Sequence, residues 1–261
     1  MSRTLAIILN HNLPEMTDAL FASLVNHKGN DYELLIMDNG SRYDLKSKHT
    51  SLFLENNIFW GGALNEAFKL VLEDQQYDSL LFMNNDIEVN GDGFVNQLRQ
   101  ELFKNDFAIV TACIAGKANP WKQMQNWGSK NTRIVKWIDN QAPLFHRKLI
   151  EEIQQFDESL VYGWGQELVC HDICKRNNWQ IGVCDFITMI HYGQQTFHQD
   201  RLFSLDPSKS IHRQELKALP YEEFAEKARE SWVNYFKKDE KWFSEMVQYG
   251  NSYNREDILI R

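Results

Sequence analysis

The sequence has 261 residues, a length that suits one large α/β domain or one domain with a tail. Hydrophobic residues make up 43% and charged residues 25%, with 13 Gly and 5 Pro, and this composition excludes disordered, collagen-like and low-complexity proteins. The formal net charge of −8 argues against binding of nucleic acid mainly by phosphate neutralisation, although it allows a local basic face.

Neither export nor membrane insertion is expected. The longest apolar run near the start, Leu5–Leu9, is shorter than a signal-peptide core or a membrane span. The four cysteines do not form a disulfide framework. Three of them, together with His191, have the chemistry of zinc ligands, but their spacing matches no common zinc motif, which favours buried thiols. We therefore expect a cytoplasmic protein without integral membrane contact.

The first 115 residues alternate short apolar runs with amphipathic stretches, a pattern typical of β-α-β units on a parallel sheet. Strands are expected at 5–9, 33–37, 51–54, 79–83 and 108–114, and helices from Pro14 to Val25 and at 65–72. Residues 116–140 are polar and rich in Trp, and no element is assigned to them. Helices at 147–152 and 167–177 precede a strand at 181–190, and a further helix is expected after Pro220.

The domain organisation follows from this pattern. We expect one domain over residues 1–199, divided at residue 115 into two halves, and a helical C-terminal extension over residues 200–261. Several of the eight Trp lie beside glycines, among them Trp60, Trp127 and Trp164. Flat rings beside bare backbone suit the stacking of sugars or bases, and core packing is the alternative for each of them.

Polar residues gather where the expected strands end, which in an open α/β sheet is the edge that binds ligands. They are Asn10, Asn12, Asp38, Asn84 and Asp86. On extended chain, Asn84 and Asp86 would point the same way and could face a divalent cation with its phosphates. The alternative is an ordinary turn after a strand, since Asn and Asp favour turns.

The order and spacing of four segments carry a family resemblance. They are LAIILNHN (5–12), LIMDNGS (35–41), NIFWGGALN (57–65) and LFMNND (81–86), and together they resemble the nucleotide-sugar-binding half of family 2 glycosyltransferases. Further on, FDE (156–158), GWGQE (163–167) and DICKR (172–176) resemble the acceptor-side segment of that family, and His191 resembles its late histidine.

The resemblance implies a GT-A fold, that is, a Rossmann-like, mostly parallel sheet flanked by helices. It assigns nucleotide-sugar binding to residues 1–115 and the acceptor to residues 116–199. It also implies a nucleotide-diphosphate-sugar donor and a divalent metal, Mn²⁺ or Mg²⁺. The donor-binding candidates are Asn10, Asn12, Asp38, Gly61, Gly62, Asn65, Asn84 and Trp164. Asp38 would accept hydrogen bonds from the base or ribose, the bare backbone of the two glycines would approach the nucleotide, and Asn65 would lie at a helix start near the same ligand.

The expected metal ligands are Asp86 and His191, and a metal there would neutralise charge on the leaving group. Asp86 is the only acidic residue of its motif, a departure from the family pattern. The family also places an Asp after the acceptor-side Glu, where this chain has Leu168. For the catalytic base the candidates, in order, are Glu167, Asp172 and Asp139, because a carboxylate is the right group to deprotonate an alcohol.

We therefore expect a glycosyltransferase that moves a sugar to an acceptor hydroxyl and, by resemblance, inverts the anomeric centre. The acceptor is a saccharide, a protein, a small molecule or a hydroxymethylated DNA base. One alternative is a nucleotidyltransferase, but residues 10–14 lack the Gly-rich basic loop of such enzymes. The other alternative is a non-catalytic module that binds sugar nucleotides, suggested by the missing Asp at position 168.

Overall fold

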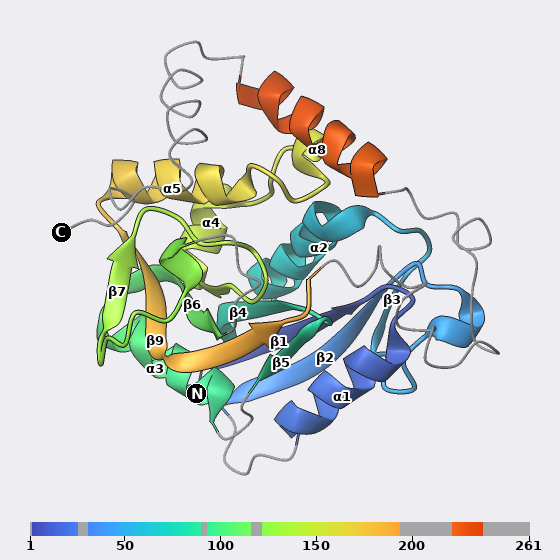
Figure 1. The fold of residues 1–261 in the computed structure, drawn as a ribbon, viewed down its shortest axis with the longest axis horizontal. Helices are drawn as coiled ribbons and strands as arrows, with labels where there is room; N and C mark the ends of the chain where they lie inside the picture. The colour runs from blue at the N-terminus through green and yellow to red at the C-terminus, as the bar shows by residue number, and fades with distance from the viewer. Residues whose placement is uncertain (1, 26–30, 90–92, 116–121, 194–220, 237–261) are drawn as a thin grey trace.

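The computed structural model describes residues 2–25, 31–89, 93–115, 122–193 and 221–236, and it has an α/β fold (Figure 1). Its strands form one mixed sheet in the order β3-β2-β1-β4-β8-β6-β9-β5, with β7 paired to β9. The strands are β1 (Arg3–Asn10), β2 (Tyr32–Asn39), β3 (Leu52–Leu54), β4 (Tyr77–Asn84), β5 (Ile87–Val89), β6 (Phe107–Ala115), β7 (Thr132–Val135), β8 (Leu144–His146) and β9 (Gln180–His191).

The first half of the sheet is parallel, as the sequence predicts. β1 pairs in parallel with β2 on one side and β4 on the other, and β2 pairs in parallel with β3. All of β1 beyond Arg3 is buried, which explains its unbroken apolar run, because a parallel strand is covered on both faces. The expected strands and the helix α1 (Pro14–Val25) are confirmed.

The second half of the sheet is mixed. β8 lies antiparallel between β4 and β6, and β5 and β7 both pair antiparallel with β9. β6 and β9 are parallel to each other. The strands β5, β7 and β8 are not predicted from the sequence, because three or four residues are too few to show a period. The helix α3 (Phe94–Lys104) is not predicted either, although its buried Phe94, Val95, Leu98 and Leu102 recur at helical spacing.

The helices cover both faces of the sheet (Figure 1). α1 packs on β1 and β2, whereas α2 (Phe59–Glu73) lies against β4 on the opposite face, as the two crossovers in opposite directions require. α4 (Arg147–Ile153) contacts both α2 and α5 (Gln166–Asn177), and α3 covers β6 and β9. The prediction for α2 was wrong at its start, because the helix begins at Phe59 and not at residue 65.

The predicted C-terminal extension contains α8 (Tyr221–Phe236), which contacts the short 3₁₀ helix η3 (Glu158–Leu160) before α5. The rest of residues 200–261 lies outside the described residues, and the division into domains stays a prediction. Within the described ranges, no helix has both the length and the hydropathy that crossing a membrane requires. All four cysteines are buried free thiols.

Candidate active site

The carboxyl ends of β1, β2 and β4 meet at one edge of the sheet, because the three strands are parallel neighbours. Asn10 pairs with Asp38 across β1 and β2, and Leu9 pairs with Asn84 across β1 and β4. The predicted polar residues therefore do share one edge. Their side chains, however, point in different directions. Some bind other parts of the protein and hold the edge in shape, and others can contact a ligand.

Asp38 and Asn10 are both fully buried and bind each other. Asn10 Nδ2 donates to Asp38 Oδ2 (2.8 Å), and the backbone N–H of Ser41 donates to Asp38 Oδ1 (2.9 Å). Asn10 Oδ1 accepts from the Thr17 hydroxyl (2.8 Å), which ties α1 to the same network. Both Asp38 oxygens are thus occupied by the protein itself. Asp38 holds the turn after β2, rather than exposing an oxygen to a base or ribose as the sequence suggests.

His11 and Asn12 continue this network along the edge, where Asn12 is buried and His11 is half-buried. Asn12, at a φ of 59°, accepts from the backbone N–H of Arg42 (2.8 Å). His11 Nδ1 lies 2.9 Å from the carbonyl of Asn39, an acceptor, and His11 Nε2 lies 3.2 Å from the amide nitrogens of Asn12 and Asn57. These partners fix a neutral ring with its proton on Nδ1. Burial lowers the pKa of His11, which agrees with the neutral form.

The expected pairing of Asn84 and Asp86 on extended chain is wrong. β4 ends at Asn84, and Asn85 with Asp86 forms a turn before β5. Asn84 Oδ1 accepts from the indole N–H of Trp60 (2.7 Å), so its carbonyl is used inside the protein. Trp60 packs edge-on against Phe82, with ring centroids 5.2 Å apart. Asn84 therefore fixes the start of α2 to the end of β4.

Asp86 and His191 are brought together, as predicted for a metal site. β9 pairs with β5 so that His191 lies opposite Ile87, and His191 Nε2 is 3.3 Å from Asp86 Oδ1. Their side chains are 21% and 9% exposed, so the pair is largely shielded from water but reachable. Burial lowers the pKa of His191, but the hydrogen bond and charge of Asp86, with the charge of Asp139, outweigh it, and the net shift is upward.

The chemistry of this pair fits a divalent cation. A carboxylate oxygen and an imidazole nitrogen are ligands that Mn²⁺ accepts, and carboxylates also suit Mg²⁺. Across the described ranges, no group of three or more His, Cys, Asp or Glu side chains is arranged to hold a metal. A cation held here would therefore take its other ligands from the diphosphate of a donor and from water.

The two predicted glycines lie in the first turn of α2 and differ in their surroundings. A Cβ on Gly61 would lie 2.4 Å from Gln166 Nε2 and 2.6 Å and 2.8 Å from the carbonyl oxygens of Leu160 and Val161. The N–H of Gly61 donates to Val161 (2.8 Å). The bare backbone of Gly61 thus approaches the chain itself and not a nucleotide. For a Cβ on Gly62, the three nearest atoms would all belong to the side chain of Ile58, at 3.0–3.3 Å.

Asn65 also faces the protein. It lies within α2 and not at its start, and its Nδ2 donates to the carbonyl of Phe156 (2.9 Å) while its Oδ1 accepts from the N–H of the same residue (2.8 Å). Both ends of the amide are engaged. The expectation that Asn65 reaches the donor is therefore not supported by its hydrogen bonds, which join α2 to the segment before η3.

The three base candidates lie in different surroundings. Glu167 is in the first turn of α5, where its Oε2 accepts from the N–H of Gly165 (3.0 Å), and Trp164 is half-buried just before that helix. Asp172 accepts from Arg176 one turn later (3.0 Å) in a surface ion pair. Asp139 is the candidate whose charge acts on His191. Of the two secondary candidates, Asp139 is near the Asp86–His191 pair, and Asp172 is bound to a surface arginine.

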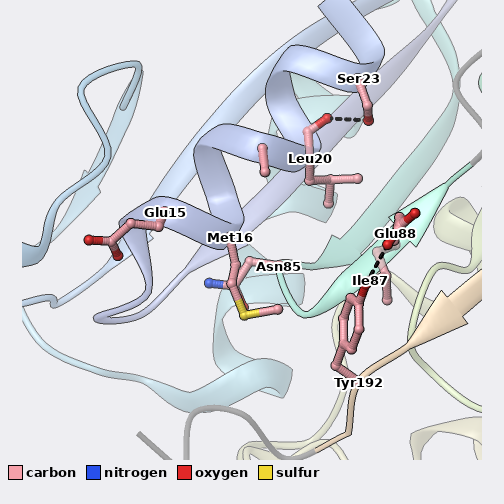
Figure 2. Close-up of a pocket in the computed structure, with 9 residues that line it drawn as sticks. Glu15, Met16, Leu20, Ser23, Asn85, Ile87, Glu88 and Tyr192 are labelled. Atoms are coloured by element: carbon pink, nitrogen blue, oxygen red, sulfur yellow. Dashed lines mark hydrogen bonds between the residues drawn. The ribbon is translucent and has the colours of Figure 1, made fainter. Parts of the chain in front are cut away.

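A separate cavity of about 310 Å³ lies between α1 and the β4–β5 turn (Figure 2). Met16 and Leu20 of α1 face Asn85 and Ile87 across it, and the Tyr192 hydroxyl donates to Glu88 at its rim. None of the predicted donor, metal or base residues, all of which the structure describes, lines this cavity.

Comparison with known proteins shows the family and the fold to which this arrangement belongs. Residues 5–150, more than half of the chain, match the family described as glycosyl transferase family 2. In sequence, no curated protein matches the chain. A structure of GalNAc-T7 with UDP, GalNAc and Mn²⁺ is similar at a TM-score of 0.61 and 13% identity over 98% of this chain, which spans only 58% of that one.

Two structures of TarS residues 1–349 from S. aureus are similar at TM-scores of 0.51 and 0.50, with 13% and 14% identity. They cover 89% and 90% of this chain and are covered over 71% and 72% of their own length, and the second contains UDP. At these identities the similarity establishes the fold, which is the expected GT-A arrangement. With its family motifs placed along the carboxyl edge of that fold, the chain belongs to glycosyl transferase family 2.

Proposed function

We propose that this glycosyltransferase moves a sugar from a nucleoside-diphosphate donor to an acceptor hydroxyl, with a divalent cation held by Asp86 and His191. The observation that carries the proposal is the meeting of these two side chains, 3.3 Å apart, at the carboxyl edge of the sheet. The family match supports sugar transfer. The UDP and Mn²⁺ in structures of the same fold support the donor class and the cation.

Each residue of the edge has a proposed task. Asp86 and His191 bind the cation, which when bound would neutralise negative charge on the departing diphosphate. Asp38 and Asn10 hold the turn after β2 in place, so that the exposed part of the edge can bind the nucleotide. Trp60 and Asn84 fix the start of α2 beside the same edge.

For the proton transfer we propose Glu167 as the base and an inverting, single-displacement reaction. In that reaction the acceptor oxygen attacks the anomeric carbon, its proton passes to Glu167, and the diphosphate leaves with the bonding electrons. Glu167 stands in the segment that packs on Trp60, since a Cβ on Gly163 would lie 3.2 Å from that ring. Asp139 is the second candidate, because of its position near His191.

The test measures hydrolysis and transfer with a panel of labelled sugar nucleotides, with Mn²⁺ or chelator present. Asp86→Asn should lower kcat/KM by about 10²–10³-fold and weaken the response to Mn²⁺, because it replaces a charged carboxylate ligand with a neutral amide. Asp172→Asn, a carboxylate change on the surface of α5, is the matched control and should leave both unchanged. Full activity in chelator or in Asp86→Asn would contradict the metal assignment. If no donor is turned over, the alternative of a non-catalytic module that binds sugar nucleotides would be favoured.

The base is tested separately by Glu167→Gln, which keeps the side-chain shape. A fall in kcat of about 10²–10⁴-fold with unchanged donor affinity is expected. A larger loss in Asp139→Asn than in Glu167→Gln would transfer the role to Asp139. A product that retains the anomeric configuration of the donor would refute the inverting mechanism.

A further inference from the structure

Trp127 presents a large apolar surface to solvent on the acceptor side of the fold. It lies between η2 (Lys122–Met124) and β7 and is 44% exposed. The next residue, Gly128, has open space around the position of a Cβ, and Asn126 and Lys130 are exposed as well. An exposed tryptophan in a loop could be an accident of the surface. The way in which this loop is held indicates otherwise.

The loop is built around the buried carboxylate of Asp185 in β9. Asp185 Oδ2 accepts from the backbone N–H groups of Trp127 (3.1 Å) and Ser129 (3.0 Å), and Oδ1 accepts from Arg133 Nε (2.8 Å). The Asp185 side chain is 0% exposed and that of Arg133 is 10% exposed. Because a buried ion pair pays a large desolvation cost, it is a poor way to gain stability and a better way to fix one conformation.

The Trp127 ring itself is also fixed. Its indole N–H donates to the carbonyl of Lys122 (2.8 Å), and the Arg133 guanidinium lies 4.7 Å from the ring centroid. The polar atom of the side chain is thus satisfied and one face is covered by a cation that Asp185 neutralises. What remains exposed is rigid carbon surface, which can bind a flat apolar ligand face at little cost in conformational entropy.

We propose that the exposed face of Trp127 stacks on a sugar ring of the acceptor, which makes the acceptor a saccharide of more than one unit. A pyranose has an apolar face for the ring and hydroxyls at its rim for the polar neighbours Asn126 and Lys130. A protein partner would need a wider apolar patch than one ring among polar residues. A nucleobase would arrive on a polyanion, against a net charge of −8. The inference rests on the proposed transfer function.

Trp127 lies within reach of the proposed reaction centre at Asp86 and His191. Gln125 bridges to Ile114 of β6, and Ile114 pairs with Met189 of β9, two residues before His191. With strands about 4.8 Å apart and residues about 3.3 Å apart along a strand, Gln125 and His191 are on the order of 10–15 Å from each other. Trp127 itself is bound to Asp185, six residues before His191 on β9, which at about 3.3 Å per residue puts Trp127 and His191 on the order of 20 Å apart. A sugar stacked on Trp127 is thus too far away to receive the new unit and near enough to belong to the same acceptor chain.

The first test detects binding without any need for turnover. The protein labelled with 5-fluorotryptophan is observed by ¹⁹F NMR, with the Trp127 signal assigned by its loss in Trp127→Phe. Neutral mono-, di- and trisaccharides of glucose, galactose and N-acetylglucosamine are added at about 10 mM, enough to occupy a site with a Kd of about 1 mM. At least one di- or trisaccharide should shift the Trp127 signal. No shift with any saccharide, or a shift with UMP alone, would overturn the proposal.

The second test uses the transfer reaction. Trp127→Ala should raise KM for the trisaccharide acceptor about 10-fold, while KM for the monosaccharide and the rate of donor hydrolysis stay unchanged. Trp127→Tyr, which keeps a ring, should recover most of the affinity, and Phe103→Ala, which removes a 37% exposed ring on α3, should change nothing. An equal effect of Trp127→Ala on mono- and trisaccharide would refute stacking. Absence of donor hydrolysis would instead refute the proposed function. The ¹⁹F result would then decide whether Trp127 binds a saccharide.

Discussion

Replacing Gly61 with alanine should destabilise the protein, whereas the same change at Gly62 should not. The added methyl group at position 61 would lie 2.4–2.8 Å from three atoms, two of which are the backbone carbonyl oxygens of Leu160 and Val161. Contacts this short force a backbone to move, and a move here also lengthens the hydrogen bond from the Gly61 N–H to Val161. At position 62 the three nearest atoms all belong to the Ile58 side chain, at 3.0–3.3 Å, so the overlap is milder and involves no backbone carbonyl.

The expected size follows from three contributions. Overpacking costs about 1–3 kcal/mol, and weakening the hydrogen bond costs about 1 kcal/mol. Replacing a helical glycine with alanine returns at most about 1 kcal/mol, and this gain is common to both variants. We therefore expect Gly61→Ala to lower the free energy of unfolding by about 1–3 kcal/mol and Gly62→Ala to leave it unchanged or raise it slightly.

Urea titrations followed by circular dichroism would measure both variants against the wild type. Calorimetry with a nucleoside diphosphate separates this structural effect from a ligand effect. Equal stabilities of the two variants would refute the packing argument. A Gly61→Ala variant of normal stability that had lost nucleotide binding would restore the original view that the glycine makes room for the donor.

Two further predictions concern stability. Asp185→Asn should lower the free energy of unfolding by about 3–5 kcal/mol in urea titrations because it leaves Arg133 buried without its counter-charge, whereas Asp172→Asn should cost less than about 1 kcal/mol; similar losses would contradict the assigned burial. Burial lowers the pKa of His11 in the folded protein, so below about pH 6.5 the unfolded state binds more protons than the folded state. The free energy of unfolding therefore decreases as the pH is lowered. His11→Gln should flatten this decline between about pH 7 and pH 5, and an unchanged slope would exclude His11 as a source.

The long elements could be predicted from the sequence, because burial on both faces of β1 and β4 leaves continuous apolar runs. The short strands could not, since β8 is defined only by its partners on either side. For the site, the sequence places Asp38 at the correct edge but cannot tell which way its carboxylate faces. Likewise, the sequence cannot distinguish a glycine that makes room for a ligand from Gly61, which makes room for the backbone of Leu160 and Val161.

Contacts between residues that are distant in sequence explain the other differences between the predicted and the observed site. Asn65 is occupied by Phe156, and Trp127 is held by Asp185, and neither pairing leaves a local pattern. By contrast, the meeting of Asp86 and His191 was predictable because the family resemblance implies that both are ligands of one cation.

The spacing of Gly61 and Asn65 constrains how this protein can change in length. The two positions are four residues apart in α2, and so they lie on one side of the helix, where both are joined to the stretch between Phe156 and Val161. A single insertion or deletion between them would rotate the following part of the helix by about 100° and separate the two joints. This turn of α2 must therefore keep its number of residues even where its residue types differ.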